Sequence, residues 1–144
     1  MARPLLLDQK HAAQGTRAQA VVYALEQGCY LTTAARYAGL SPRTLHNYLA
    51  SGRSAEARAD TGEKLDDKDQ QFLHFLHSVK KALADQQLDC LAVIQEAAGK
   101  GTWQAAAWLL ERRTPAQWAK RDGKQDELSE WTEPMAGTYD LLPA

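Results

Sequence analysis

The sequence lacks several features that define whole classes of protein. It contains only two cysteines, Cys29 and Cys90, and neither lies in a CxxC pair or beside a metal-ligand pattern, so we predict two reduced thiols in small apolar sites. No apolar run approaches the roughly 20 residues that a membrane-spanning helix needs. The first residues carry one arginine and three consecutive leucines, which is too short an apolar stretch for a secretory signal. We therefore expect a cytoplasmic protein that does not contact a membrane.

Motifs for catalysis and for binding of metals or cofactors are also lacking. The GKGT stretch at 99–102 has neither the upstream glycine nor the preceding strand of a phosphate-binding loop, and no nucleophile elbow is found. His74 and His77 lie one helical turn apart, but no third metal ligand accompanies them. We predict that this chain is not an enzyme and has no cofactor and no metal site.

The net charge is only −1, but charge is unevenly distributed along the chain. Residues 1–58 carry a net charge of +4, residues 59–99 one of −4, residues 100–124 one of +4, and residues 125–144 one of −5. Alternating blocks of this kind indicate segments with different functions. A basic N-terminal module in a nearly neutral protein is compatible with phosphate binding at that module alone.

Helical periodicity runs through most of the sequence, which predicts an all-α fold. A first helix is expected between Thr16, which can cap its start, and Gly28, which can end it. A long amphipathic helix is expected from Asp66 to Gly99, with a change of phase near Gln86–Gln87. We predict no strand and no internal repeat.

The most specific signal is LTTAARYAGLSPRTLHNYL, residues 31–49, which has the pattern of a DNA-binding helix-turn-helix. Thr32 or Thr33 can cap the first helix, and Gly39 can make the turn. Ser41 can cap the second helix, with a proline in the first helical position. The positions expected to face inwards are Ala34, Ala35, Ala38, Leu40, Leu45, Tyr48 and Leu49.

The outward side of the second helix carries side chains suited to DNA. Arginine can bond guanine edges or phosphate, and asparagine can pair with adenine. Arg43, His46 and Asn47 are the predicted base readers, and flanking arginines are predicted to reach phosphates. The predicted DNA-binding residues are Arg36, Ser41, Arg43, Thr44, His46, Asn47, Arg53 and Arg58. A structural bundle or a protein-binding element is the alternative interpretation of the same helices.

The long helix carries more apolar surface than one short neighbour can cover. The stripe from Phe72 to Leu83 has spacings of four, three and four, which suits packing against another helix. We infer association between subunits, although a second helix of the same chain can cover part of this surface. The predicted oligomer interface consists of Phe72, Leu76, Val79, Leu83, Leu91, Trp103 and Trp108.

A helical corner, WLLERRTPAQWAKR, follows at residues 108–121. Thr102 can cap a helix over 103–113, and the Thr114–Gln117 segment fits a capping box with proline in the first helical position. A new short helix is therefore expected to begin at Pro115. Trp103, Trp108 and Trp118 are interpreted as core residues rather than platforms for stacking a ligand.

The last residues, 123–144, lose the helical periodicity, are acidic, and are predicted to form a flexible tail. Its predicted partner-docking residues are Trp131, Met135, Tyr139, Leu141 and Leu142. A solvated end with no partner is the alternative. The predicted organisation is a helix-turn-helix domain (1–52), a linker (53–65), a helical oligomerisation domain built on a long hairpin (66–122), and the tail (123–144).

The combination of a helix-turn-helix, a long helical hairpin and the Trp/Arg corner resembles the small terminase subunits of tailed bacteriophages. The corner has the form Trp-x4-Trp-Leu-Leu-Glu-Arg-Arg-x-Pro-x-x-Trp-x-x-Arg, and the resemblance spans residues 15–122. It implies a ring-forming component of the host cytoplasm that binds double-stranded viral DNA at the packaging-initiation site. It also implies that this component regulates the ATPase and nuclease of a large terminase subunit. In a ring, several helix-turn-helix modules would bind the same DNA at once, so that weak single contacts together give strong binding.

Two other interpretations predict different behaviour. A helix-turn-helix transcriptional regulator or transposase-associated DNA-binding protein should be a dimer that binds half-sites about one helical turn apart. A scaffold in which the three N-terminal helices only pack should not bind DNA at all.

Overall fold

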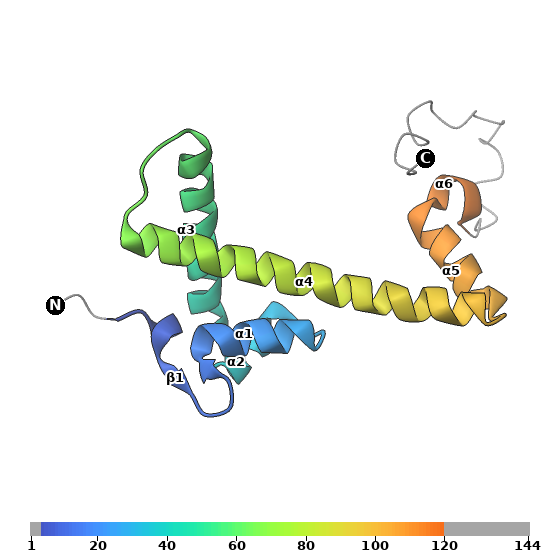
Figure 1. Ribbon diagram of the computed structural model, residues 1–144, viewed down its shortest axis with the longest axis horizontal. Coiled ribbons are helices and arrows are strands. Elements are labelled where there is room, and N and C mark those ends of the chain that lie inside the picture. The colour runs from blue at the N-terminus through green and yellow to red at the C-terminus, as the bar shows by residue number, and fades with distance from the viewer. Residues whose placement is uncertain (1–3, 120–144) are drawn as a thin grey trace. The chain divides into compact units, whose positions relative to one another are not determined.

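The fold is described by a computed structural model for residues 4–119 (Figure 1). It is mainly helical, which confirms the all-α prediction at the level of fold class. The predicted tail residues Trp131, Met135, Tyr139, Leu141 and Leu142 lie outside the described residues. The elements are η1 (Leu6–Asp8), β1 (Lys10–His11), β2 (Gly15–Thr16), α1 (Arg17–Glu26), α2 (Leu31–Tyr37), α3 (Pro42–Asp60), α4 (Asp67–Gly99), α5 (Trp103–Arg113) and α6 (Pro115–Trp118).

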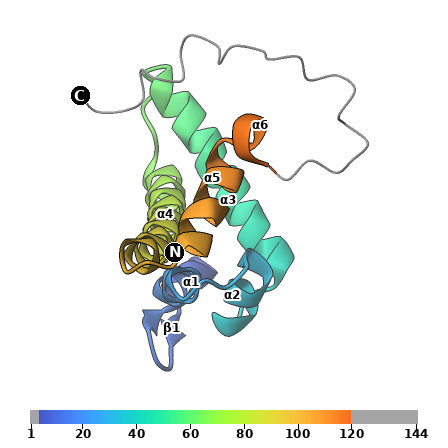
Figure 2. The same ribbon diagram turned by 90° about the vertical axis from the view of Figure 1, so that its right-hand side faces the viewer.

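The described residues form two compact units, one up to Val93 and the other from Ile94 onwards, with the boundary inside α4. In the first unit, α2 packs against α1 and α3, and these helices share one core with the first half of α4 (Figures 1 and 2). Their shared core is apolar, and Val21, Leu25 and Leu45 are its largest fully buried side chains. The positions predicted to face inwards in residues 31–49 are buried, except Tyr48, which is half-buried and stacks on Phe72 with ring centroids 5.5 Å apart.

Two of the predicted helix caps are confirmed. The Thr16 hydroxyl accepts a hydrogen bond from the Gln19 backbone N–H, and the Gln19 side chain accepts one from the Thr16 N–H, which makes a capping box. The Ser41 hydroxyl accepts from the Thr44 N–H at 3.1 Å, with Pro42 in the first helical position. The cap predicted at Thr32 or Thr33 is wrong, because α2 already begins at Leu31 and both threonines lie within its first turn.

A short antiparallel hairpin precedes α1, where no strand was expected. Its register pairs Lys10 with Thr16 and His11 with Gly15. Strands of two residues are too short to produce an alternating pattern, so no periodic signal marks them in the sequence.

The predicted linker, 53–65, is largely helical. Helix α3 continues through it to Asp60, so that only residues 61–66 connect α3 to α4. The small residues that suggested a linker instead allow a close crossing: Gly52 and Ala55 are buried. A Cβ atom on Gly52 would lie 2.7 Å from the Phe72 carbonyl oxygen and 2.8 Å from Leu76 Cβ. Small side chains on α3 therefore set how closely it approaches α4.

Three residues of the predicted oligomer interface belong to the core of a single chain. Phe72, Leu76 and Val79 are buried together with Phe75 and Ala82 in the cluster that α1, α2 and α3 also supply. The apolar stripe on α4 was correctly recognised, but its first half packs against helices of its own chain. These three residues are therefore not available to a second subunit.

Helix α4 contributes buried residues to the core only as far as Ala82. It remains one helix through Gln86–Gln87, where a change of phase was predicted, but no residue from Leu83 to Gly99 is buried. Its end is well defined, because Gly101 has φ +98° and the Thr102 N–H donates to the Ala97 carbonyl at 3.0 Å. The pairing of α4 with the next helix in a hairpin stays a prediction.

The second unit differs from the prediction in its caps and in its tryptophans. Neither Thr102 nor Thr114 caps a helix with its side chain. The Thr114 hydroxyl instead donates to the Leu110 carbonyl at 3.0 Å. The start of α6 at Pro115 is confirmed. Trp103, Trp108 and Trp118 are 69%, 45% and 55% exposed, so they are not core residues of the single chain. No residue of α5 or α6 is buried.

The close crossing at Gly52 predicts that Gly→Ala has opposite effects on stability at Gly52 and at Gly99. On helix propensity alone, Gly→Ala within a helix stabilises by about 0.5–1 kcal/mol. Gly99→Ala should show this gain, because nothing lies within 4 Å of its Cβ position. Gly52→Ala should instead destabilise by about 1–3 kcal/mol, because α3 and α4 must move apart. Urea unfolding followed by circular dichroism measures both, and stabilisation by Gly52→Ala would contradict the close crossing.

Candidate nucleic-acid interface

The candidate interface is built around the turn between α2 and α3. Gly39 has φ +75°, a conformation that favours glycine, and it directs the chain back towards the core. The Leu40 N–H donates to the Ala35 carbonyl at 2.9 Å, and Leu40 is buried. Ser41 then starts α3. Gly39 and Ser41 thus fix where α2 ends and α3 begins, and the helix-turn-helix stays a prediction.

His11 in the N-terminal hairpin and Arg17 at the start of α1 brace this turn, which the sequence did not predict. The Arg17 guanidinium donates through Nη1 to the Gly39 carbonyl at 3.0 Å. His11 donates through Nε2 to the Tyr37 carbonyl at 2.9 Å, while its Nδ1 accepts from the Ala13 and Gln14 N–H groups. These bonds satisfy carbonyl groups at the end of α2 that would otherwise have no partner within the helix. They join residues 22 and 26 positions apart, which no local pattern reveals.

Most of the predicted DNA-binding side chains are exposed on α2 and α3. Arg43, Asn47 and Arg53, together with His46, are exposed on α3, and Arg36 is exposed at the end of α2. Spacings of three, four and ten residues from Arg43 place the α3 residues on one side of the helix. No acidic residue occurs between residues 27 and 55, so this surface carries only positive formal charge. The surface can therefore attract phosphate and present hydrogen-bond donors to bases.

Ser41 and Thr44, two of the predicted DNA-binding residues, make hydrogen bonds to each other at the N-terminal cap of α3. The Ser41 and Thr44 hydroxyl oxygens lie 2.8 Å apart, and the Ser41 oxygen also accepts from the Thr44 N–H. Their main contribution is therefore to fix the first turn of α3, on which Arg43 lies.

Arg58 has a structural role in place of the predicted contact with phosphate. Its guanidinium lies 2.7 Å from Asp69 and 3.3 Å from Glu63, and its hydrogen bond to Asp69 is the main cause of a raised pKa. It joins the end of α3 to the connection and to the start of α4. The DNA-binding set is therefore corrected to exclude Arg58.

Glu56 makes a second polar link between α3 and α4. Its carboxylate accepts from Lys80 Nζ at 2.8 Å and lies 3.2 Å from His77 Nε2. Hydrogen bonds from Lys80 and then from His77 hold the pKa of this carboxyl below its usual value. His77 thus contacts an acid on a neighbouring helix, and within residues 4–119 no group of His, Cys, Asp or Glu is arranged to hold a metal ion.

Comparisons of the chain with protein-family models, with curated proteins and with solved structures found no match. The resemblance to small terminase subunits therefore depends on the quoted residues alone and stays a hypothesis. Among the helices described for this chain, none combines the length and apolar character needed to cross a membrane.

The polar link at Glu56 should make stability depend on pH. The usual pKa of a glutamate carboxyl is 4.5, and that of Glu56 is lower in the folded state. The ionised carboxylate therefore stabilises the fold above pH 4.5, and this contribution is lost as the pH falls through the lowered pKa. Glu56→Gln should therefore lower the urea midpoint at neutral pH, and the difference from wild type should shrink in acid. Asp60→Asn, at the exposed end of α3, is the matched control. A difference that stays constant with pH would contradict this role.

Proposed function

We propose that this chain is a DNA-binding, self-associating adaptor of the small terminase type. In this proposal it recognises viral double-stranded DNA at the packaging-initiation site and regulates the ATPase and nuclease of a large subunit, without catalysing a reaction itself. The observation that carries the DNA-binding part is the exposed face of α3 up to residue 55, which has no acidic residue and presents Arg43, His46 and Asn47 together on a helix that starts at a fixed turn.

The chemistry of that face suits two kinds of contact. Arg43 and Asn47 have the donor and acceptor groups that read guanine and adenine in the major groove. Arg36 and Arg53 flank them and suit contacts with phosphate, which supply affinity but little sequence preference. One such module gives modest affinity, so the proposal requires several copies acting together.

The second half of the described chain supports self-association. Leu88 and Val93 on α4 are exposed, as are Trp103, Trp108 and Leu110 on α5. Short helices derive most of their stability from packing of an apolar face, and exposed apolar surface of this kind marks interaction sites. Of the predicted interface, Leu83, Leu91, Trp103 and Trp108 remain available for this role.

The steps beyond DNA binding and self-association are supported by the resemblance alone. They are the ring, the packaging-initiation site, and contact with a large terminase subunit. Docking of the tail residues on that subunit belongs to the same proposal. The main alternative is a dimeric helix-turn-helix regulator or transposase-associated protein.

Replacement of the base-reading residues tests DNA binding. Arg43→Ala with Asn47→Ala should weaken binding by roughly 5–150-fold for each lost bidentate contact, since each is worth about 1–3 kcal/mol. Fluorescence anisotropy with labelled duplex DNA at fixed salt measures the change. Lys64→Ala, which removes an exposed charge from the connection between α3 and α4, is the control and should have little effect. Unchanged affinity in the double variant would support the non-DNA scaffold.

The mass in solution tests self-association. Native mass spectrometry at micromolar concentration should detect a closed species larger than a dimer of the 15.9 kDa chain. A monomer would exclude the ring. A dimer that protects paired half-sites in a footprint would favour the regulator instead.

A further inference from the structure

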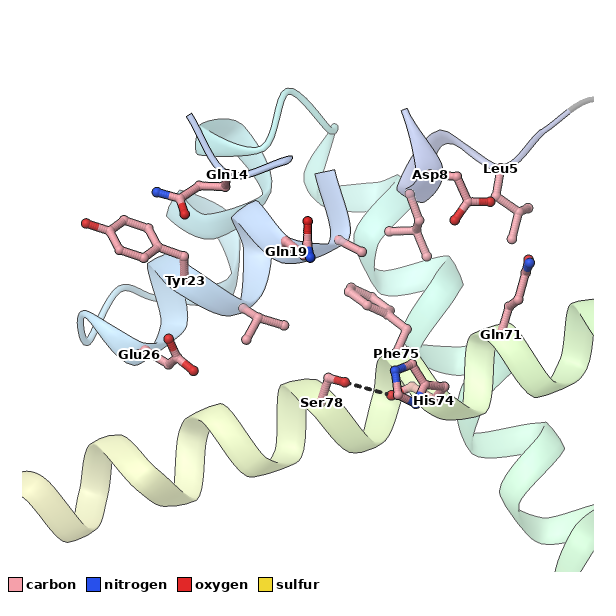
Figure 3. A pocket seen from close by; sticks show the side chains of 13 residues that line it. Leu5, Asp8, Gln14, Gln19, Tyr23, Glu26, Gln71, His74, Phe75 and Ser78 are labelled. Carbon is pink, nitrogen blue, oxygen red and sulfur yellow. Dashed lines mark hydrogen bonds between the residues drawn. The ribbon is translucent and has the colours of Figure 1, made fainter. Parts of the chain in front are cut away.

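An open cleft of about 470 Å³ lies on the first unit, between the N-terminal turn η1, α1 and the first half of α4 (Figure 3). Its apolar lining includes Ala18, Val22 and Tyr23 from α1, and Phe75 from α4. Figure 3 shows Glu26 beside Tyr23 on α1, with Ser78 and His74 opposite on α4. This volume falls within the range of sites that hold a bound group.

The charged residues on this side of the unit are mainly acidic. Asp8 and Glu26 are the only residues with a formal charge that line the cleft. A second hollow shares Glu26 and is lined also by Asp85, Asp89 and Leu88. Lys81 lies next to it and is paired with Asp85. We call the two hollows together the α1/α4 groove: the first hollow has an apolar lining, and the second is mainly polar and acidic.

The second unit carries a surface of complementary character. Trp103, Trp108 and Leu110 are exposed on α5, and Trp118 is exposed on α6. Helix α5 ends in Arg112 and Arg113, and the Arg112 guanidinium lies 5.2 Å from the centre of the Trp108 ring. Aromatic and basic groups are thus presented together, whereas the groove offers apolar surface and carboxylates.

We propose that the α1/α4 groove of one copy binds α5 of a second copy. This inference rests on the self-association in the proposed function and adds which surfaces meet. The Trp108 side chain enters the apolar cleft, and Arg112 or Arg113 pairs with Glu26 at its edge. The Trp108 side chain alone supplies roughly 150–250 Å² of contact, and the rest of the exposed face of α5 would have to supply the remainder of the roughly 800 Å² per partner in a stable interface.

The two surfaces differ, so the contact is heterologous. Each copy uses its groove for one neighbour and its α5 for another. Such head-to-tail contacts generate closed rings when the rotation between copies completes a circle. An interface formed by α5 against α5 would instead be self-complementary and would give a dimer.

Two variants separate the surfaces. The groove variant combines Ala18→Phe, which fills the cleft, with Glu26→Arg. The helix variant combines Trp108→Ala with Arg112→Glu and leaves the first unit unchanged. Native mass spectrometry should show wild-type oligomers but 15.9 kDa monomers for each variant alone. Asp60→Arg, a charge reversal at the end of α3, is the control and should assemble like wild type. Circular dichroism melts confirm that each variant folds.

Mixing the two variants gives the decisive result. An intact groove on one then meets an intact α5 on the other, so one contact forms, and the mixture should contain dimers of one copy of each variant but no larger ring. A mixture that remains monomeric would place the contact within a single chain and overturn the proposal. Oligomers of wild-type size for the groove variant alone would also overturn it, while leaving self-association intact. A monomeric wild type would instead refute the ring of the proposed function.

Discussion

The close crossing of α3 over α4 at Gly52 is the contact on which the first unit depends. Because Gly52 has no side chain, the backbone of α4 at Phe72 and the side chain of Leu76 can approach α3 directly. Polar links from Glu56 to Lys80 and from Arg58 to Asp69 lie on the following turns of α3 and hold the same two helices. The exposed residues from Arg43 to Arg53 therefore belong to a helix that is fixed along its length.

This arrangement divides α3 into two parts with different tasks. Its first turns present Arg43, His46 and Asn47 to solvent, and its last turns bind α4. Arg58 belongs to the second part, although its charge suggested the first. Helix α4 is divided in the same way, since its residues up to Ala82 complete the core and its later residues remain exposed.

Local signals explain what the sequence could predict. The apolar positions of residues 31–49, the caps at Thr16 and Ser41, and the exposure of Arg36, Arg43 and Arg53 all follow from spacing within a few residues. The misassigned residues depend on distant partners. Phe72, Leu76 and Val79 form a correct helical stripe, but spacing does not state whether the covering helices come from the same chain. The linker was misassigned because small residues suit a close crossing as well as a loop.

The brace that His11 of the N-terminal hairpin and Arg17 of α1 form with the α2–α3 turn has a practical consequence. His11 and Arg17 hold the Tyr37 and Gly39 carbonyls from a segment that precedes the candidate DNA-reading helix by more than 20 residues. The start of α3 is therefore oriented partly by residues that present no base-reading group themselves. Shortening the chain at its N-terminus, or fusing a bulky tag close to His11, would disturb the start of α3 from outside residues 31–49.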